Sequence, residues 1–201
     1  MSSSLKRSSL RRFVGAQPAA PTVERCEMCR EVIDERHGHV VEIEHRSLMC
    51  ACRPCYLLFT QADAGKFRAV PERYRHDPTL TQAEWQSLGI PVNTVFFLRS
   101  DSGLAAFYPS PAGATECLLD LDAWVELALS HPMLAEARPE VEAILVRDTE
   151  CYLVPIDVCY RLVGVVRVYW KGFDGGQEAQ EQIDGIFAGI RARAVAAGSG
   201  A

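Results

Sequence analysis

The chain has 201 residues, of which 48% are hydrophobic, and it carries a formal net charge of −5 at pH 7. No apolar run approaches the roughly 20 residues that a membrane-spanning helix needs, so we expect no membrane span. Net negative charge argues against a nucleic-acid partner, because phosphate contacts need clustered Lys and Arg. The length suits one domain of ordinary size with a small module attached.

The first residues, 1–22, stand apart by composition. They are rich in Ser, Ala, Pro and Arg, and they carry Lys6, Arg7, Arg11 and Arg12 but no acidic residue. This composition predicts a disordered basic tail. The pair Arg11 and Arg12 resembles that of a twin-arginine export signal, but the segment after it contains Gln and Pro instead of an apolar run. We therefore expect a cytoplasmic protein.

Cysteine spacing marks the region 23–62 as a metal-binding module. Two Cys-x-x-Cys pairs, Cys26/Cys29 and Cys52/Cys55, flank a segment that contains Val and Ile. In a reducing compartment this spacing favours a tetrahedral metal site over disulfides, with zinc as the ion. Iron in a rubredoxin-like site or an Fe–S cluster would use the same thiolates. Four buried apolar cysteines without a metal are the remaining alternative.

The residues between and after these pairs predict a hairpin and a helix. Within 39–45, the apolar residues 41 and 43 alternate with the acidic residues 42 and 44, which predicts a strand, and 47–50 is its return strand. Pro54 suits the first turn of a helix, and we expect the apolar residues 57–59 to form the buried side of that helix. A cysteine turn, a hairpin and two ligands from the start of a helix is the plan of a treble-clef zinc finger. A zinc ribbon or a rubredoxin-like site is the close alternative.

Further residues of the module are candidates for roles beside the metal. Cys50 lies two residues before Cys52 and is an alternative ligand, a redox-active thiol or an ordinary strand residue. His37, His39 and His45 could each replace a cysteine as ligand. Because four cysteines are present, we expect these histidines at the surface or hydrogen-bonded around the ligands.

The region 63–195 is predicted to be an α+β domain with a mostly antiparallel sheet, because paired strands alternate with helices. The hydrophobic periods predict strands over 66–71, 92–98, 103–108, 141–146 and 151–154, with 72–77 as a polar connector. They predict helices over 81–88, 121–130, 156–170 and 176–195, although β-branched residues also suit 156–170 to a strand. Thr81 and Glu84 match the capping-box pattern, and 196–201 is a predicted frayed tail.

The helix predicted over 121–130 has apolar residues at spacings of three and four. They are Leu121, Trp124, Val125, Ala128 and Leu129. We expect this stripe to face the core of the domain.

The segment 108–116 is a second candidate site. It is stiffened by prolines and carries the polar side chains Tyr108, Ser110, Thr115 and Glu116. It is either an ordinary connector from a strand to a helix or a contact surface for a partner or ligand. No nucleophile, base and orienting group can be assembled from the sequence, so we predict that the protein is not an enzyme.

Several motifs together resemble a known family. They are CEMC, CACRPC followed by an aromatic residue and leucines, FYPSPAGATE, LVPIDVCYRLVGVVR, and a tryptophan before a Gly-Gly pair. This combination, which spans about 24–190, is similar to a family of small bacterial Cys-rich proteins of unknown function encoded beside nickel–iron (NiFe) hydrogenase genes. The resemblance implies a role in assembling, supporting or electron-coupling a hydrogenase.

These observations predict a non-enzymatic accessory protein. Its four-cysteine module would hold a structural zinc ion, and its α+β domain would bind a protein partner, which the resemblance suggests is a NiFe hydrogenase or its maturation machinery. The alternative is a rubredoxin-like iron or Fe–S protein that transfers electrons to or from a hydrogenase.

Overall fold

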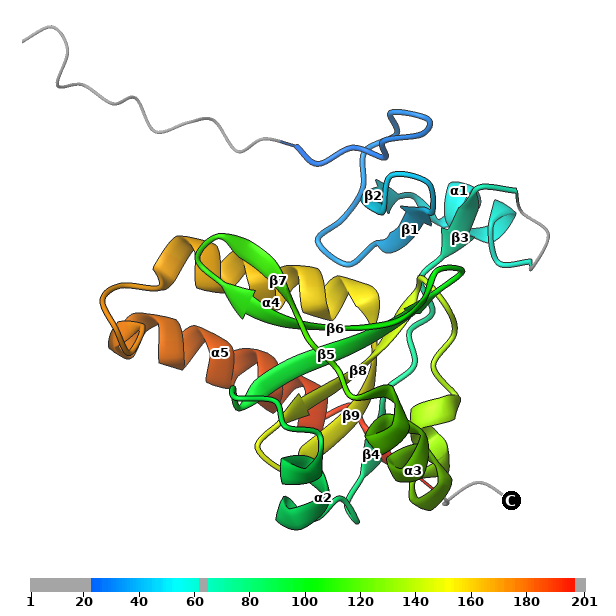
Figure 1. The fold of residues 1–201 in the computed structure, drawn as a ribbon. Coiled ribbons are helices and arrows are strands. Elements are labelled where there is room, and N and C mark those ends of the chain that lie inside the picture. Colours follow the sequence, from blue (N-terminus) through cyan, green and yellow to red (C-terminus); the bar gives the residue numbers. More distant parts are fainter. Residues whose placement is uncertain (1–22, 62–64, 198–201) are drawn as a thin grey trace, which may run out of the picture.

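The computed structural model describes residues 23–61 and 65–197, so the predicted basic tail lies outside the described residues. Two sheets organise this part of the chain (Figure 1). The small sheet has the strand order β2-β1-β3, and the large one has the order β10-β4-β9-β8-β5-β6-β7. Every neighbouring pair is antiparallel except β10 and β4. The prediction of an α+β fold with mostly antiparallel sheets is confirmed.

The small sheet and one short helix contain the cysteine pairs. Their elements are β1 (Gly38–Glu42), β2 (Ser47–Ala51), α1 (Arg53–Leu58) and β3 (Phe67–Ala69). The hairpin and the helix confirm the local predictions, although the first strand is shorter than expected because a turn follows Glu42. Because β3 pairs with β1, the small sheet continues past residue 62, where the sequence placed the end of the module.

The predicted buried side of α1, residues 57–59, is confirmed for Phe59 and wrong for the two leucines. Leu57 and Leu58 are 48% and 69% exposed, and α1 itself has no fully buried residue. Tyr56 and Phe59, which are three positions apart, face the small sheet instead, and the ring of Phe59 lies 5.2 Å from that of Phe67. Since three residues nearly complete a helical turn, this choice of face leaves both leucines in solvent.

The large sheet alternates with helices as the sequence indicated. Its strands are β4 (Arg75–Asp77), β5 (Thr94–Ser100), β6 (Gly103–Ser110), β7 (Gly113–Cys117), β8 (Glu142–Arg147), β9 (Glu150–Pro155) and β10 (Val195–Ala196). Its helices are α2 (Gln82–Ser87), α3 (Leu121–Ser130), the 3-10 helix η2 (Pro132–Ala135), α4 (Ile156–Tyr169) and α5 (Gly176–Arg191). The capping box of α2 and the helical state of 156–169 are confirmed. No helix in the described residues has the length and apolar character to cross a bilayer.

Both faces of the large sheet are covered, which explains its apolar strands. Along β8, Ala143 and Leu145 pack with α4 and α5, whereas Ile144 and Val146 pack with α2, α3 and η2. This alternation follows from the two-residue period of a strand. Figure 1 shows α4 and α5 side by side along one face of the sheet.

Of the apolar stripe predicted for α3, only Trp124 and Ala128 face the core. Trp124 and Leu127 are the buried residues of this helix, and the ring of Trp124 lies 4.3 Å from that of Phe97. Leu121, Val125 and Leu129, which lie four residues apart, are exposed together with Leu118. The large indole therefore sets the rotation of the helix, and a row of apolar side chains faces solvent.

The segment 108–116 is a hairpin rather than the expected connector. After β6 the chain turns at Pro111 and returns as β7, which places Tyr108 opposite Thr115 and Pro109 opposite Ala114. The pairing of β6 with β5 ends at Phe107, so the missing N–H of Pro109 costs no hydrogen bond to β5. The prolines and polar residues of this segment indicated a loop, so the edge strand β7 was not predicted from the sequence.

Besides β7, two short strands were not predicted. The polar connector 72–77 contains β4, which pairs with β9, and Val195–Ala196 pairs in parallel with β4. Both are too short for a hydrophobic period to be recognised. They extend the large sheet to Ala196, which lies within the predicted frayed tail.

The small sheet is fixed against the start of α4. Val41 of β1 belongs to the core that α4 and α5 share, and Leu48 of β2 packs against it. The hydroxyl of Tyr160 donates a hydrogen bond to the carbonyl of Arg46 in the β1–β2 turn. These contacts place the cysteine module beside the large domain rather than on a free tether.

The connector from β3 to β4 is held by a buried ion pair. The guanidinium of Arg73 donates two hydrogen bonds to the carboxylate of Glu142, at 2.8 Å and 2.7 Å. Glu142 is fully buried at the start of β8, and the backbone N–H of Arg138 also donates to it. This pair ties the chain that leaves the module to the centre of the large sheet.

A second buried polar pair joins β4 to the end of α3. The Asp77 carboxylate accepts hydrogen bonds from the Thr79 backbone N–H at 2.9 Å and from His131 Nδ1 at 2.8 Å. Burial opposes ionisation of Asp77, but the hydrogen bonds from Thr79 and His131 outweigh it, so the pKa of this carboxyl is lowered.

Candidate metal centre

Two separate turns present the cysteine pairs. Cys26 and Cys29 lie in a tight turn, in which the Cys26 carbonyl accepts a hydrogen bond from the Arg30 N–H at 2.8 Å. Arg30 has a φ of 69°, which lets the turn close directly after the second thiol. Cys52 is the N-cap residue of α1, and Cys55 lies in the first turn of that helix. Pro54 in the first turn favours the start of α1 at this point, and α1 in turn positions the thiols of Cys52 and Cys55.

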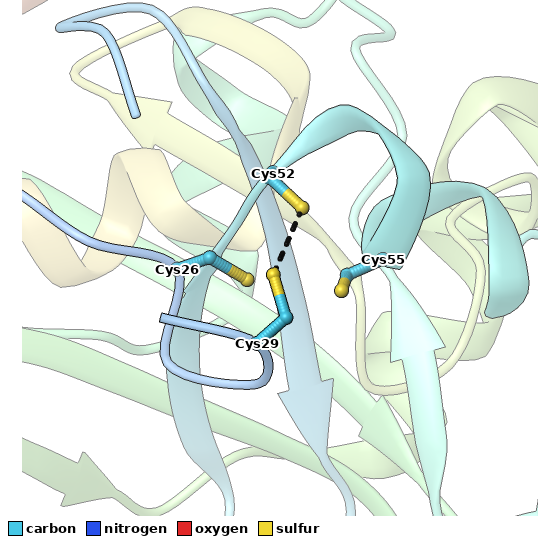
Figure 2. A group of neighbouring side chains, drawn as sticks. All are labelled: Cys26, Cys29, Cys52 and Cys55. Atoms are coloured by element: carbon cyan, nitrogen blue, oxygen red, sulfur yellow. Dashed lines mark hydrogen bonds between the residues drawn. The ribbon is translucent and has the colours of Figure 1, made fainter. Parts of the chain in front are cut away.

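The four thiols converge on one point (Figure 2). Their sulfur atoms all lie within 4.8 Å of one another, and those of Cys29 and Cys52 are 3.5 Å apart. Zn–S bonds of about 2.3 Å in a tetrahedron would separate the sulfurs by roughly 3.8 Å. The observed cluster is close to this geometry, and all four cysteines are free thiols. Clustering of these four residues is consistent with metal binding.

The thiols differ in how easily they lose a proton. Burial opposes ionisation of Cys26, but backbone N–H groups of Cys52, Cys29 and Met28 outweigh it and lower its pKa to about 6. Burial and hydrogen bonds among the thiols raise the pKa of Cys55 to about 12. Negative charge on Cys26 thus opposes a second thiolate nearby. A dication supplies the compensating charge that would let all four ionise.

The module follows the treble-clef plan that the sequence predicted. A cysteine turn and the β1–β2 hairpin precede the α1 N-terminus, which carries the second pair. Cys26 and Cys52 are buried, Cys55 is half-buried and Cys29 is exposed. Four thiolates would complete a tetrahedral coordination shell, as in structural sites. Iron would accept the same four thiolates.

Cys50 and two of the predicted histidines form a cluster of their own. Cys50 lies opposite His39 in the β1–β2 pair, and ligand atoms of His37, His39 and Cys50 lie within 4.8 Å of one another. His45 is 72% exposed and contacts Glu42 at 3.2 Å. The three histidines therefore do not act as one group.

Residues of the second candidate site share the β6–β7 hairpin. Ser110 and Thr115 are joined through their hydroxyls at 2.9 Å, and Glu116 lies opposite Phe107. Tyr108 and Ser110 line a cavity of about 280 Å³ that α4 and α5 also border. Its lining is largely apolar, and the hydroxyls of Ser110 and Thr115 are occupied by each other.

The sequence did not reveal two carboxylates at the Cys50 cluster. Asp157, in the first turn of α4, lies 3.0 Å from His39 Nδ1. Glu27 Oε2 accepts a hydrogen bond from the Cys50 backbone N–H at 2.8 Å. Neither contact had a local signal, because the partners come from different elements.

Comparison with known proteins gives one family. A model described as a family of unknown function, DUF5947, matches residues 25–194. This span includes both cysteine pairs and the large sheet almost to its last strand. No curated protein and no solved structure matches the chain significantly.

Proposed function

We infer that this chain, which belongs to the DUF5947 family, is a non-enzymatic accessory protein in which structural zinc supports a protein-docking surface. The observation that carries the zinc assignment is the convergence of Cys26, Cys29, Cys52 and Cys55 from two turns of the chain. A cytoplasmic location suits this assignment, because reducing conditions keep the thiols available to a metal.

The small core of the module supports a structural role for the ion. The buried residues of that core are Cys26, Ile33, Val40, Ala51 and Cys52, so two of the five are themselves thiols. Such a core gives little hydrophobic stabilisation. Structural zinc contributes about 10 kcal/mol or more of apparent binding energy to small domains, which is enough to hold this module.

Electron transfer by iron in the same site is the second candidate. The exposure of Cys29 favours it, because an electron could pass between this thiolate and a partner. Ferric thiolates absorb visible light and zinc thiolates do not, so the two candidates differ in colour.

The test is metal analysis with a visible spectrum on anaerobically purified protein. We expect a colourless protein that contains zinc, and we expect Cys52→Ser to lose one zinc equivalent and the local fold of the module. Cys117→Ser is the matched control, since this half-buried cysteine lies outside the cluster. Stoichiometric iron in the purified protein would refute structural zinc and support the electron-transfer function. Full metal content in Cys52→Ser would refute the ligand assignment.

A row of exposed apolar side chains along α3 and just before it supports the docking surface. Leu118, Leu121, Val125 and Leu129 are large apolar residues in solvent, and such contiguous groups often mark protein contacts. The candidate partner is the one that the resemblance implies, a NiFe hydrogenase or a protein of its maturation machinery. We expect Leu121→Ser with Val125→Ser to abolish co-purification with that partner while zinc content stays unchanged. Equal co-purification of the double variant would contradict this surface.

A further inference from the structure

A second group of metal-ligating side chains lies outside the four-cysteine site. His37 precedes β1, His39 lies on β1 and Cys50 lies opposite His39 on β2. One ring nitrogen of each histidine and the Cys50 sulfur lie within 4.8 Å of one another. Because β1 side chains alternate, His39 shares its face of the sheet with Val41, which packs toward α4. The group therefore lies at the junction of the module and the large domain.

An oxygen atom lies close to Nδ1 of each imidazole and indicates where the ring proton sits. His37 Nδ1 lies 2.8 Å from the Asp34 carbonyl oxygen, and His39 Nδ1 lies 3.0 Å from Asp157 Oδ2. A carbonyl oxygen only accepts, so His37 Nδ1 carries a proton, and the Asp157 carboxylate favours a proton on the His39 Nδ1 that faces it. In the neutral ring, Nε2 then holds the free lone pair. A metal-binding histidine is typically arranged in this way, with a carbonyl or carboxylate behind it.

Burial makes His37 unusual as a structural residue. Its side chain is only 9% exposed, and its Nε2 is buried without a hydrogen-bond partner among the described residues. Buried polar atoms are normally paired, so an orphaned lone pair indicates a missing partner. The rings of His37 and His39 are 4.9 Å apart, which brings a second imidazole to the same place.

Negative charge surrounds the three residues. Glu24 lies 3.8 Å from His37 Nδ1, Asp157 contacts His39, and Glu27 accepts from the Cys50 backbone. These carboxylates come from two segments of the chain, the first residues of the module and the start of α4, and the electrostatic potential they create favours a cation.

We propose that His37 Nε2, His39 Nε2 and Cys50 Sγ form a second metal site that binds zinc or a similar first-row dication. Two imidazoles and one thiolate are borderline ligands, which suit zinc better than calcium or magnesium. Three protein ligands leave one tetrahedral position open for water or another small ligand. The site shares no residue with the four-cysteine centre, so it is independent of the proposed function.

Zinc titration of the reduced, metal-depleted full chain tests this site. We expect the wild type to bind two equivalents, and His37→Gln and Cys50→Ser to bind one each while retaining their far-UV circular dichroism. His45→Gln is the matched control and should bind two, because this exposed histidine contacts Glu42 instead. Two equivalents in both His37→Gln and Cys50→Ser would overturn the proposal.

Cobalt separates the two sites by their spectra. A four-thiolate site gives far stronger charge-transfer absorption than a site with one thiolate, so His37→Gln should keep the strong bands. If the wild type binds one ion, shows the strong bands and keeps both in His37→Gln, the second site is overturned and the four-cysteine site stands. If the wild type binds one ion without the strong bands, and His37→Gln loses that ion, the second site is supported and the four-cysteine assignment is refuted.

Asp157 is a positioning residue for His39 in this proposal. Removing such a carboxylate behind a ligand typically weakens metal affinity by roughly 10- to 100-fold. We therefore expect Asp157→Ala to lower the affinity of the second site for zinc by that factor and to leave the affinity of the four-cysteine site unchanged. Unchanged affinity for both equivalents would refute this role of Asp157.

Discussion

The ion pair between Arg73 and Glu142 allows a quantitative test of how the module is joined to the large sheet. Replacing Arg73 with Met keeps most of the apolar stem and removes both hydrogen bonds to the fully buried carboxylate. One hydrogen bond to Glu142 remains, from the backbone N–H of Arg138 at 2.8 Å. The variant therefore buries a charge that has lost its countercharge.

The expected cost can be worked out from this geometry. Breaking a buried pair by removing one partner costs about 3–5 kcal/mol. The side chain of Arg73 is 31% exposed, so water can reach part of the gap, and the Arg138 N–H still compensates one oxygen. We expect the lower end of the range, about 3 kcal/mol, which is a large fraction of the 5–15 kcal/mol typical of a domain.

Urea unfolding of the zinc-loaded protein, followed by tryptophan fluorescence, measures this loss. Glu142→Gln provides the second arm of a double-mutant cycle, because it removes the buried charge and keeps the shape. We expect Arg73→Met with Glu142→Gln to be more stable than Arg73→Met alone by about 1 kcal/mol or more. A cost for Arg73→Met below about 1 kcal/mol, or strict additivity in the cycle, would refute the reasoning.

Three further substitutions test other parts of the fold. Asp77 has a lowered pKa, so the hydrogen bonds that its carboxylate accepts from Thr79 and His131 stabilise the fold above its ordinary pKa of 3.8, and this stabilisation is lost as pH falls below that value. Asp77→Asn should cost about 1–3 kcal/mol at pH 7, with a difference from wild type that shrinks toward pH 3 in urea unfolding; a constant difference would contradict this. Gly38→Ala would place a Cβ 2.5 Å from Tyr56 Cδ2, so we expect the fold to lose about 1–3 kcal/mol of stability and to release zinc to a chelator faster. An unchanged release rate would contradict this. Thr81→Ala removes the α2 capping box and should cost about 1 kcal/mol in thermal unfolding, with Thr81→Ser near wild type; equal losses in both would argue against the cap.

Much of the local structure could be predicted from short stretches of sequence. Cysteine spacing predicted which four thiols would cluster, because each Cys-x-x-Cys pair is closed by its own turn. Caps and hydrophobic periods predicted the helices, including 156–169, because an apolar stripe of several turns outweighs the strand preference of its β-branched residues. These features depend on neighbours within a few residues, so the order of residues alone determines them.

Tertiary packing decided which side of a helix is buried. Both α1 and α3 carry apolar residues around much of their circumference, so the sequence offers more than one possible face. On α3, contact between Trp124 and Phe97 selected one face and left Leu121 and Val125 in solvent. The result depends on a partner far away in the chain, and the helix itself carries no signal for it.

The cluster of His37, His39 and Cys50 shows the same division more sharply. Each residue was recognisable by sequence as a candidate near the metal, but the residues could not be grouped. Strand register brings Cys50 opposite His39, and docking of α4 brings Asp157 to the same imidazole. Register and docking are set by hydrophobic burial summed over whole elements. Local sequence therefore determined which ligands are available, whereas the tertiary structure alone decided which of them meet.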